Sequence, residues 1–257
     1  MERSEEMRLA GKVAIITGGS RGIGRAMALA FAQEGAKVVV VGRNKSRCQE
    51  VFAQISRSGG TAISIQADVS KEADVAAMVS QIKEKFKRID ILVNNAAVNL
   101  PFREVIELTL DEWNWVIATN LTGPFLCSRA VLPLMIAQRS GKIINMASLG
   151  GRQGAAGRAP YRPAKAAIIN FTECLAAEVK EHGIDVNAIC PGVVATDMMS
   201  EITGGKVPSY AMPLEDIASV AVFLASDESR SVTGTAIDVL GLSNPVFGVQ
   251  ASVTRKK

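Results

Sequence analysis

The sequence has few of the side chains from which hydrolytic triads and metal centres are built. It contains one histidine, His182, and four cysteines, Cys48, Cys127, Cys174 and Cys190, without a Cys-x-x-Cys pair. This composition argues against a Ser/His/Asp triad and a histidine-rich metal site, and we expect no bound metal. Widely spaced cysteines favour packed thiols in a reducing compartment over a disulfide framework.

Basic stripes, linkers and targeting segments are also missing. The net charge is only +4 over 257 residues, and aromatic residues make up 5% of the chain. Lysine and arginine do not interleave with aromatics, so nucleic acid is not an expected partner. The N-terminus lacks the apolar core of a signal peptide, and no apolar run is predicted to span a bilayer. We therefore expect a cytoplasmic protein with no membrane partner.

The chain is predicted to form a single domain. Hydrophobic residues make up 48% of it, which is ample for a large core, and no Ser/Pro/Gly tract or block of like charges divides it. The expected boundaries are a charged N-terminal tail over 1–8, one folded domain over 9–242 and a C-terminal extension over 243–257.

Short runs rich in valine and isoleucine alternate with longer helical patterns. This alternation is typical of a doubly wound, Rossmann-type α/β fold with a seven-stranded parallel sheet and helices on both faces. In such folds ligands bind beyond the carboxyl ends of the strands. The predicted strands are 12–17, 37–41, 61–67, 89–95, 141–148, 184–190 and 234–240.

Capping patterns predict where several helices begin. Thr109 and Glu112 have the spacing of a capping box, Ser70 can cap the helix after the third strand, and Pro213 stands where a late helix should start. We therefore expect helices to follow each of these positions.

The stretch TGGSRGIG follows the first predicted strand and opens a helix. Gly18, Gly22 and Gly24 leave backbone N–H groups and the helix dipole accessible to a pyrophosphate. Because the loop lies between a strand and a helix, a dinucleotide site is favoured over a plain tight turn.

The end of the second strand favours NADP over NAD. Gly42 occupies the position where an NAD-binding protein is expected to have an acidic residue, and Arg43 follows it. Arg43 and Arg21 of the glycine loop can pair with a ribose 2′-phosphate. The alternative is that both arginines are solvated at the surface.

A tyrosine and a lysine lie four positions apart in the stretch YRPAK. If Pro160 and Pro163 lie in the first turn of a helix, Tyr161 and Lys165 share one face of it. Taken alone, this pair is more often structural than catalytic.

Together these motifs resemble the short-chain dehydrogenase/reductase family. The likeness covers roughly residues 9–241, and it is close to 3-oxoacyl-acyl-carrier-protein reductase-like members. It implies a nicotinamide cofactor and hydride transfer at a carbonyl carbon. The motifs that carry it are TGGSRGIG, NNAA (94–97), Asn120, Ser148, YRPAK and PGVVAT (191–196).

The resemblance implies a catalytic role for four residues. Tyr161 would be the general acid in reduction, with its phenol pKa lowered by the Lys165 ammonium. Ser148 would hold the substrate oxygen, and Asn120 would hold a water on the proton path to Lys165.

The same resemblance extends the expected cofactor site. It places Asp68 and Val69 beside the adenine, Asn95 and Ala96 beside the ribose, and 191–196 along the nicotinamide carboxamide. The full set expected to bind NADP is Gly18, Ser20, Arg21, Gly22, Ile23, Gly24, Arg43, Asn44, Asp68, Val69, Asn95, Ala96, Tyr161, Lys165, Pro191, Gly192, Val194 and Thr196.

Three stretches depart from the family pattern. Ala97 replaces a usual glycine, and Leu240 stands at a usually acidic position near the end of the last strand. The substrate lid over 197–212 is short, which predicts an open site with an apolar wall of Met198, Met199 and Ile202.

The glycine-rich segment 149–160 faces the predicted lid. Its Arg152 and Arg158 could meet an anionic substrate, although solvated loop arginines are more common.

The predicted activity is NADPH-dependent reduction of a ketone, such as a 3-oxoacyl thioester, to a secondary alcohol. Two alternatives stay open: an alcohol or polyol dehydrogenase working in the oxidative direction, and a catalytically silent NADP-binding regulator or scaffold. The expected partners are a small carbonyl or alcohol substrate and further copies of the chain. A dimer or tetramer would form through helices at about 124–139 and 160–182.

Overall fold

The protein was analysed as a computed structural model, which describes residues 7–243. Seven strands form one parallel sheet in the order β3-β2-β1-β4-β5-β6-β7, which confirms the predicted Rossmann-type fold of a single domain. Every run predicted as a strand forms one, within three residues at each end. The strands are β1 Val13–Thr17, β2 Lys37–Gly42, β3 Thr61–Gln66, β4 Ile91–Asn94, β5 Gly141–Met146, β6 Ile184–Pro191 and β7 Ala236–Val239.

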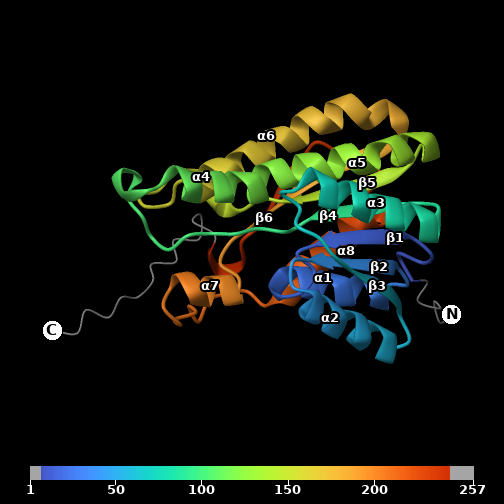
Figure 1. Cartoon of the computed structure of the whole chain (residues 1–257), viewed down its shortest axis with the longest axis horizontal. Helices are drawn as coiled ribbons and strands as arrows, with labels where there is room; N and C mark the ends of the chain where they lie inside the picture. Colours follow the sequence, from blue (N-terminus) through green and yellow to red (C-terminus); the bar gives the residue numbers. More distant parts are fainter. Residues whose placement is uncertain (1–6, 244–257) are drawn as a thin grey trace.

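Helices cover both faces of the sheet (Figure 1). One face packs on α1 (Gly22–Gln33), α2 (Lys45–Arg57) and α8 (Leu214–Ala225), and the other on α3 (Glu72–Phe86), α5 (Gly123–Gln138) and α6 (Tyr161–Val179). Along β1, Ala14 and Ile16 enter the first hydrophobic cluster, while Val13 and Ile15 enter the second. Strand side chains alternate between the two faces, so a sheet covered on both sides needs unbroken apolar strands.

The helix α4 (Leu110–Ile117) runs into α5 without a break, because a π-helical turn at Ala118–Thr122 joins them. The resulting 29-residue helix, Leu110–Gln138, is long and apolar enough by length and composition to cross a membrane. The expectation that no apolar run reaches this length was therefore wrong. Core helices of water-soluble folds have the same composition, and α5 packs on β4, β5 and α3.

Most predicted helix starts are confirmed, and one is wrong. Thr109 and Glu112 form the capping box of α4, and Pro213 immediately precedes α8. Ser70, however, caps no helix: its backbone N–H and hydroxyl both donate to Asp68 Oδ1, at 3.0 and 2.7 Å. Lys71 occupies the N-cap position of α3 instead, without a side-chain cap.

The ends of the described region modify the expected boundaries. Arg8, which we had assigned to the tail, pairs with Glu34, and Leu9 is fully buried. At the other end, β7 is followed by a 3-10 turn at Gly241–Ser243. Residues 1–6 and 244–257, which include most of the predicted tail and extension, lie outside the described residues.

Three cysteines are buried as expected, whereas Cys174 is exposed on α6.

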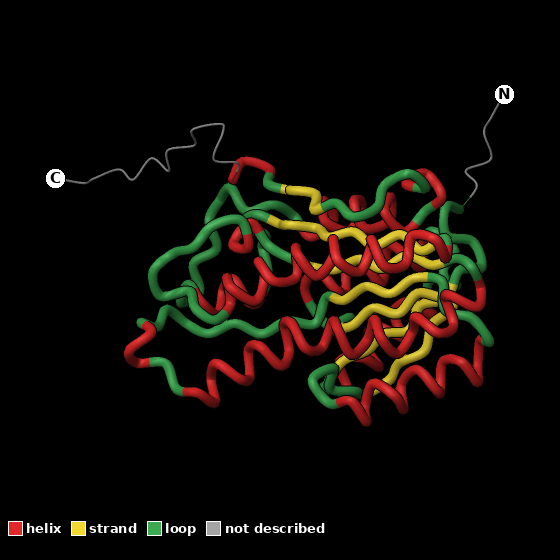
Figure 2. Tube along the Cα trace, turned by 90° about the horizontal axis from the view of Figure 1, so that it is seen from above, coloured by secondary structure: helices red, strands yellow, loops and turns green. Residues whose placement is uncertain are grey.

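The strand order reverses between β1 and β4, since β2 and β3 lie on one side of β1 and β4 to β7 on the other. The strands lie side by side in Figure 2, and each neighbouring pair is parallel. Their carboxyl ends therefore share one edge of the sheet, where the segments after β1, β4, β5 and β6 meet. The short helix α7 (Asp197–Ile202) lies over this edge (Figure 1).

Candidate active site

The glycine loop after β1 forms a cradle that side chains would fill. Gly18 has a φ of +63°, and a Cβ there would lie 2.8 Å from the Ala96 Cα. A Cβ on Gly24 would lie 2.2 Å from the Gly18 carbonyl oxygen. The loop therefore packs directly against the segment after β4 and leads into the N-terminus of α1. This fits a dinucleotide whose pyrophosphate accepts hydrogen bonds from backbone N–H groups.

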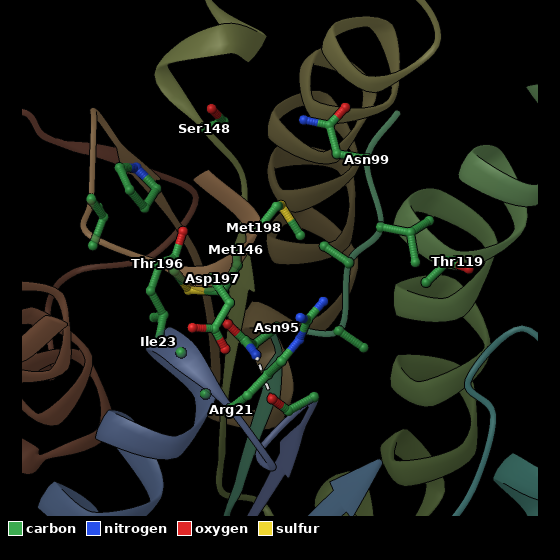
Figure 3. Close-up of a pocket in the computed structure, with 18 of the residues that line it drawn as sticks. Arg21, Ile23, Asn95, Asn99, Thr119, Met146, Ser148, Thr196, Asp197 and Met198 are labelled. Carbon is green, nitrogen blue, oxygen red and sulfur yellow. Dashed lines mark hydrogen bonds between the residues drawn. The ribbon is translucent and has the colours of Figure 1, made fainter. Parts of the chain in front are cut away.

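Asn95 and Thr17 hold this cradle together. The Asn95 side chain donates to the carbonyl oxygens of Thr17 and Gly18, at 2.9 and 3.2 Å. The Thr17 hydroxyl accepts from the backbone N–H groups of Asn95 and Ala96, at 3.0 and 3.1 Å. Sequence reasoning missed Thr17, although a threonine that ends the first strand just before the glycine loop is a visible signal. Figure 3 shows Asn95 at the glycine-loop end of the pocket.

The end of β2 forms the part of the cavity where the sequence predicts the adenosine of a dinucleotide, and we call this part the adenosine side. Gly42 faces Ser20 and Cys48, because a Cβ there would lie 3.2 Å from Ser20 Oγ and 3.0 Å from Cys48 Sγ. Asn44 caps α2 by accepting a hydrogen bond from the Arg47 backbone N–H at 3.0 Å. Arg43 and Arg47 are exposed and line the cavity. Arg47 was not predicted, since it lies one helical turn beyond the expected motif.

Arg21 forms an ion pair with Glu201 of the lid. Its Nη1 lies 2.6 Å from Glu201 Oε1 on α7, and both side chains are partly exposed. The expected pairing of Arg21 with a 2′-phosphate is therefore in competition with this ion pair. The contact joins the glycine loop to the lid, and Figure 3 labels Arg21 and Asp197, the first residue of α7, among the residues that line the pocket.

Asp68 accepts hydrogen bonds within a turn and also lines the cavity. It accepts both hydrogen bonds from Ser70, and its backbone N–H donates to Asp74 Oδ2 at 2.9 Å. Burial opposes ionisation of the carboxyl, but the Ser70 hydrogen bonds and the charge of Arg43 outweigh it and lower the pKa of Asp68. A carboxylate is thus held beside the adenosine side, with Val69 next to it in the wall.

Ser148, Tyr161 and Lys165 meet at the opposite end of the cavity. Ser148 follows β5, and its hydroxyl accepts from the Gly150 backbone N–H at 3.0 Å. Tyr161 begins α6, and Lys165 lies one turn later with its Nζ 5.7 Å from the centre of the tyrosine ring. The Lys165 side chain is 3% exposed, and its Nζ donates to the Met146 carbonyl at 2.6 Å. The sheet and one helix thus bring the three predicted residues together.

The electrostatics of this group differ from the expectation. Burial raises the pKa of Tyr161. The hydrogen bond with Ser148 and the charges of Arg158 and Arg162 lower this pKa, but burial has the larger effect. Burial likewise lowers the pKa of Lys165 to about 8. In this structure the net shift of the Tyr161 pKa is thus upward, opposite to the lowering that we expected. Burial disfavours both charged forms, and further positive charge at the site is needed to favour the phenolate.

Asn120 does not line the cavity. It is fully buried in the π-helical turn, where its side-chain amide both donates to and accepts from the backbone of Val98, at 2.8 Å each. The side chain therefore fastens the segment after β4 to the long helix. Its predicted contact with a water stays a prediction, because both polar atoms of the side chain already bond to Val98.

The cavity that joins these groups measures about 600 Å³. Met198, Met199 and Ile202 form part of its wall, as predicted for the lid. Thr196 caps α7 by accepting from the Met199 backbone N–H at 3.1 Å. Of the predicted site residues, Asn120 alone does not line this cavity. All other predicted site residues line the cavity: Gly18, Ser20, Arg21, Gly22, Ile23, Gly24, Arg43, Asn44, Asp68, Val69, Asn95, Ala96, Ser148, Tyr161, Lys165, Pro191, Gly192, Val194 and Thr196.

A nucleotide cradle joined to a Ser/Tyr/Lys group on a doubly wound sheet defines a nicotinamide-dependent oxidoreductase site. The family model for the short chain dehydrogenases matches residues 12–206. The chain therefore belongs to the short-chain dehydrogenase family, which confirms the resemblance in its sequence.

Individual relatives agree with this assignment. The chain is 41% identical over 241 residues to a 3-oxoacyl-[acyl-carrier-protein] reductase of Synechocystis, covering 91% of this chain and 97% of the relative. Among solved structures, levodione reductase has a TM-score of 0.86 at 32% identity, over 90% of this chain and 97% of that one. A putative gluconate dehydrogenase from Agrobacterium tumefaciens also has a TM-score of 0.86, at 34% identity, over 91% and 96%.

Proposed function

We propose that this protein is an NADPH-dependent carbonyl reductase that converts a ketone to a secondary alcohol. The observation that carries the proposal is the grouping of Ser148, Tyr161 and Lys165 at one end of the cavity whose other end is the glycine cradle. Similarity to 3-oxoacyl-[acyl-carrier-protein] reductases supports a 3-oxoacyl thioester or a related ketone as substrate.

In this proposal Tyr161 protonates the substrate oxygen. A bound reduced nicotinamide supplies the hydride that adds to the carbonyl carbon. Ser148 donates a hydrogen bond that holds the carbonyl oxygen beside the phenol, and Tyr161 transfers its proton to that oxygen as negative charge develops there. Lys165, held by the Met146 carbonyl, stabilises the phenolate that remains until it is reprotonated.

The preference for NADPH rests on the adenosine side of the cavity. Gly42 leaves no acidic side chain at the end of β2, and the exposed guanidinium groups of Arg43 and Arg47 lie in the same wall. An arginine binds a phosphate through charge-assisted hydrogen bonds, whereas a ribose 2′-hydroxyl gains little from it. Arg21 would join them only by leaving Glu201.

A second candidate is the reverse reaction, oxidation of a secondary alcohol. The similarity to a putative gluconate dehydrogenase favours it, because that name describes oxidation of a polyhydroxy acid. The same residues serve both directions, since Tyr161 then accepts the hydroxyl proton.

Self-association in the cytoplasm is part of the same proposal. Several large apolar side chains of the long helix and its approach are exposed, among them Ile106 at 90% and Leu110 at 71%. Trp113, Trp115 and Phe125 continue this surface along α4 and α5. Exposed apolar area of this kind marks interaction surfaces. We expect a homo-oligomer, which the mass in solution at micromolar concentration would test.

The activity is tested by following oxidation of NADPH and NADH in parallel with a panel of ketones. The panel holds acyl thioesters, cyclic ketones, sugars and oxo acids, and the matching alcohols are tested with both oxidised cofactors. We expect ketone-dependent oxidation of NADPH that is lost in Tyr161→Phe. Absence of turnover with every ketone and alcohol would contradict the proposal.

A further inference from the structure

One half-buried side chain at the reacting end of the cavity has a hydrogen-bond donor without an acceptor. Arg158 lies in the loop before α6 and lines the cavity with Tyr161. Its Nη1 is shielded from solvent and has no hydrogen-bond partner within the described residues. A buried donor without an acceptor is costly, and the cost is higher for a charged group. Such a group is expected to have a ligand.

The backbone at Arg158 is held on both sides. The preceding residue, Gly157, has a φ of +65°, and a Cβ there would overlap the Phe102 ring at 2.2 Å. The Gly157 carbonyl accepts from the Arg103 backbone N–H at 3.2 Å. The Arg158 carbonyl accepts from the Arg162 backbone N–H at 3.0 Å. These backbone contacts place Arg158 three residues before Tyr161, at the start of α6.

The neighbouring cations already have partners. Arg152 pairs with Asp238 at 2.9 Å and also donates to the Ala236 carbonyl at 2.8 Å. Arg162 donates to the carbonyls of Gln153 and Gly154, at 2.9 and 3.1 Å. The structure thus separates two arginines that the sequence treats alike: Arg152 belongs to the protein scaffold, and Arg158 faces the site.

We infer that Arg158 binds a carboxylate of the substrate, so that the protein acts on oxo acids or on the corresponding hydroxy acids. This inference rests on the proposed oxidoreductase function and identifies the substrate class of that site. The ketone would lie at Ser148 and Tyr161, and the carboxylate would pair with the Arg158 guanidinium in the cavity wall. The charge of Arg158 also acts on the phenol, as expected for a group close to it.

A carboxylate matches this position better than a phosphate does. One guanidinium offers one positive charge and a planar pair of donors, which suits a planar monoanion. A phosphate dianion would need further donors, and the nearby Arg162 and Lys165 side chains already donate to backbone carbonyls.

The test compares oxo acids with their methyl esters. Steady-state kinetics with NADPH are measured for 2-, 3-, 4- and 5-oxo acids of matched length, for each ester, and for hydroxyacetone phosphate. We expect the best acid to exceed its ester at least about tenfold in kcat/KM, chiefly through KM, because the carboxylate is held alike in the ground and transition states.

Variants assign this preference to Arg158. Arg158→Gln should lower kcat/KM at least about tenfold more for the best acid than for its ester, because the effect of the Arg158 charge on the phenol is common to both substrates. Arg158→Lys keeps the charge and should fall between the parent and Arg158→Gln. Arg152→Gln is the matched control from the same loop and should leave the acid-to-ester ratio unchanged.

The outcomes separate this inference from the proposed function. Equal use of acid and ester by the parent, an equal loss for both in Arg158→Gln, or a preference for the phosphate would overturn the carboxylate assignment. Each of these outcomes leaves carbonyl reduction standing. Failure of the folded parent to reduce any ketone or oxidise any alcohol would instead refute the proposed function, and this inference with it.

Discussion

The two ends of the cavity use charge in different ways. At the reacting end Lys165 is 3% exposed, and burial shifts the pKa values of both Tyr161 and Lys165 toward the neutral forms. At the adenosine end the arginines are exposed, and no comparable burial acts on them. An interaction with a buried group is screened much less than one at the surface. Substitutions at the reacting end should therefore have far larger effects.

The largest effect is expected for Tyr161→Phe. The change removes the proposed proton donor and keeps the ring, so kcat should fall by about a thousandfold, within the range of about 10²- to 10⁴-fold for general acid catalysis. Cofactor binding, followed by fluorescence titration with NADPH, should change little. Activity within threefold of the parent would remove Tyr161 from the mechanism.

Cofactor selectivity should show the next largest effect. Together, Gly42→Asp and Arg43→Ala should lower kcat/KM for NADPH about a hundredfold relative to NADH, which corresponds to about 2.7 kcal/mol. The loss should fall on KM. The aspartate fits only if Cys48 and Ser20 move by a few tenths of an ångström, so thermal unfolding of each single variant is the control. Equal use of both cofactors by the parent would contradict the role of Arg43.

The buried ammonium of Lys165 should make stability depend on pH. Its pKa is about 8 in the folded protein and 10.5 in the unfolded chain. Below pH 8 both states are protonated, and the buried charge lowers stability by a constant amount. Between these values the unfolded chain binds more protons, so the free energy of unfolding rises with pH.

Lys165→Met isolates this contribution. Between pH 7.5 and 9.5 the parent should gain on the order of 1 kcal/mol in unfolding free energy relative to the variant, as measured by urea denaturation. Groups that do not interact with Lys165 titrate alike in both proteins and cancel in the comparison. A difference between the two that does not change with pH would mean that Lys165 is not buried as a charge.

The smallest effect is expected at the contact between the glycine loop and the lid. Arg21 and Glu201 form a partly exposed ion pair, and such pairs contribute about 0 to 1 kcal/mol. Glu201→Gln should free Arg21 and raise the affinity for NADPH relative to NADH by no more than about fivefold, measured by calorimetry. A lower relative affinity would exclude Arg21 as a phosphate ligand.

The fold was predictable because buried parallel strands are apolar on both faces and alternate with amphipathic helices. Runs such as Lys37–Gly42 have this pattern, and every predicted strand forms. The π-turn at Ala118–Thr122 was not predictable, since its residues do not differ from those of an ordinary helix break. Ser70 was assigned to the wrong turn, because serine and aspartate two positions apart can bond to each other before either caps a helix.

The site was predictable where the backbone dictates geometry. A helix places Tyr161 and Lys165 on one face, and strand ends bring Ser148 and Gly18 to one edge. Long exposed side chains are different, because their partners come from distant segments. Neither the pairing of Arg21 with Glu201 nor the pairing of Arg152 with Asp238 has a signal in the sequence.

In the proposed reaction one proton comes from Tyr161 while a hydride passes from the cofactor to a carbonyl carbon. The most direct test uses NADPH with deuterium at both positions of the transferring carbon, followed by mass spectrometry of the alcohol formed from the best ketone of the panel. We expect one deuterium on the carbinol carbon with the parent, and product only at background level with Tyr161→Phe. An alcohol without deuterium from the parent, or the parent's yield of labelled alcohol from Tyr161→Phe, would refute the proposed reaction.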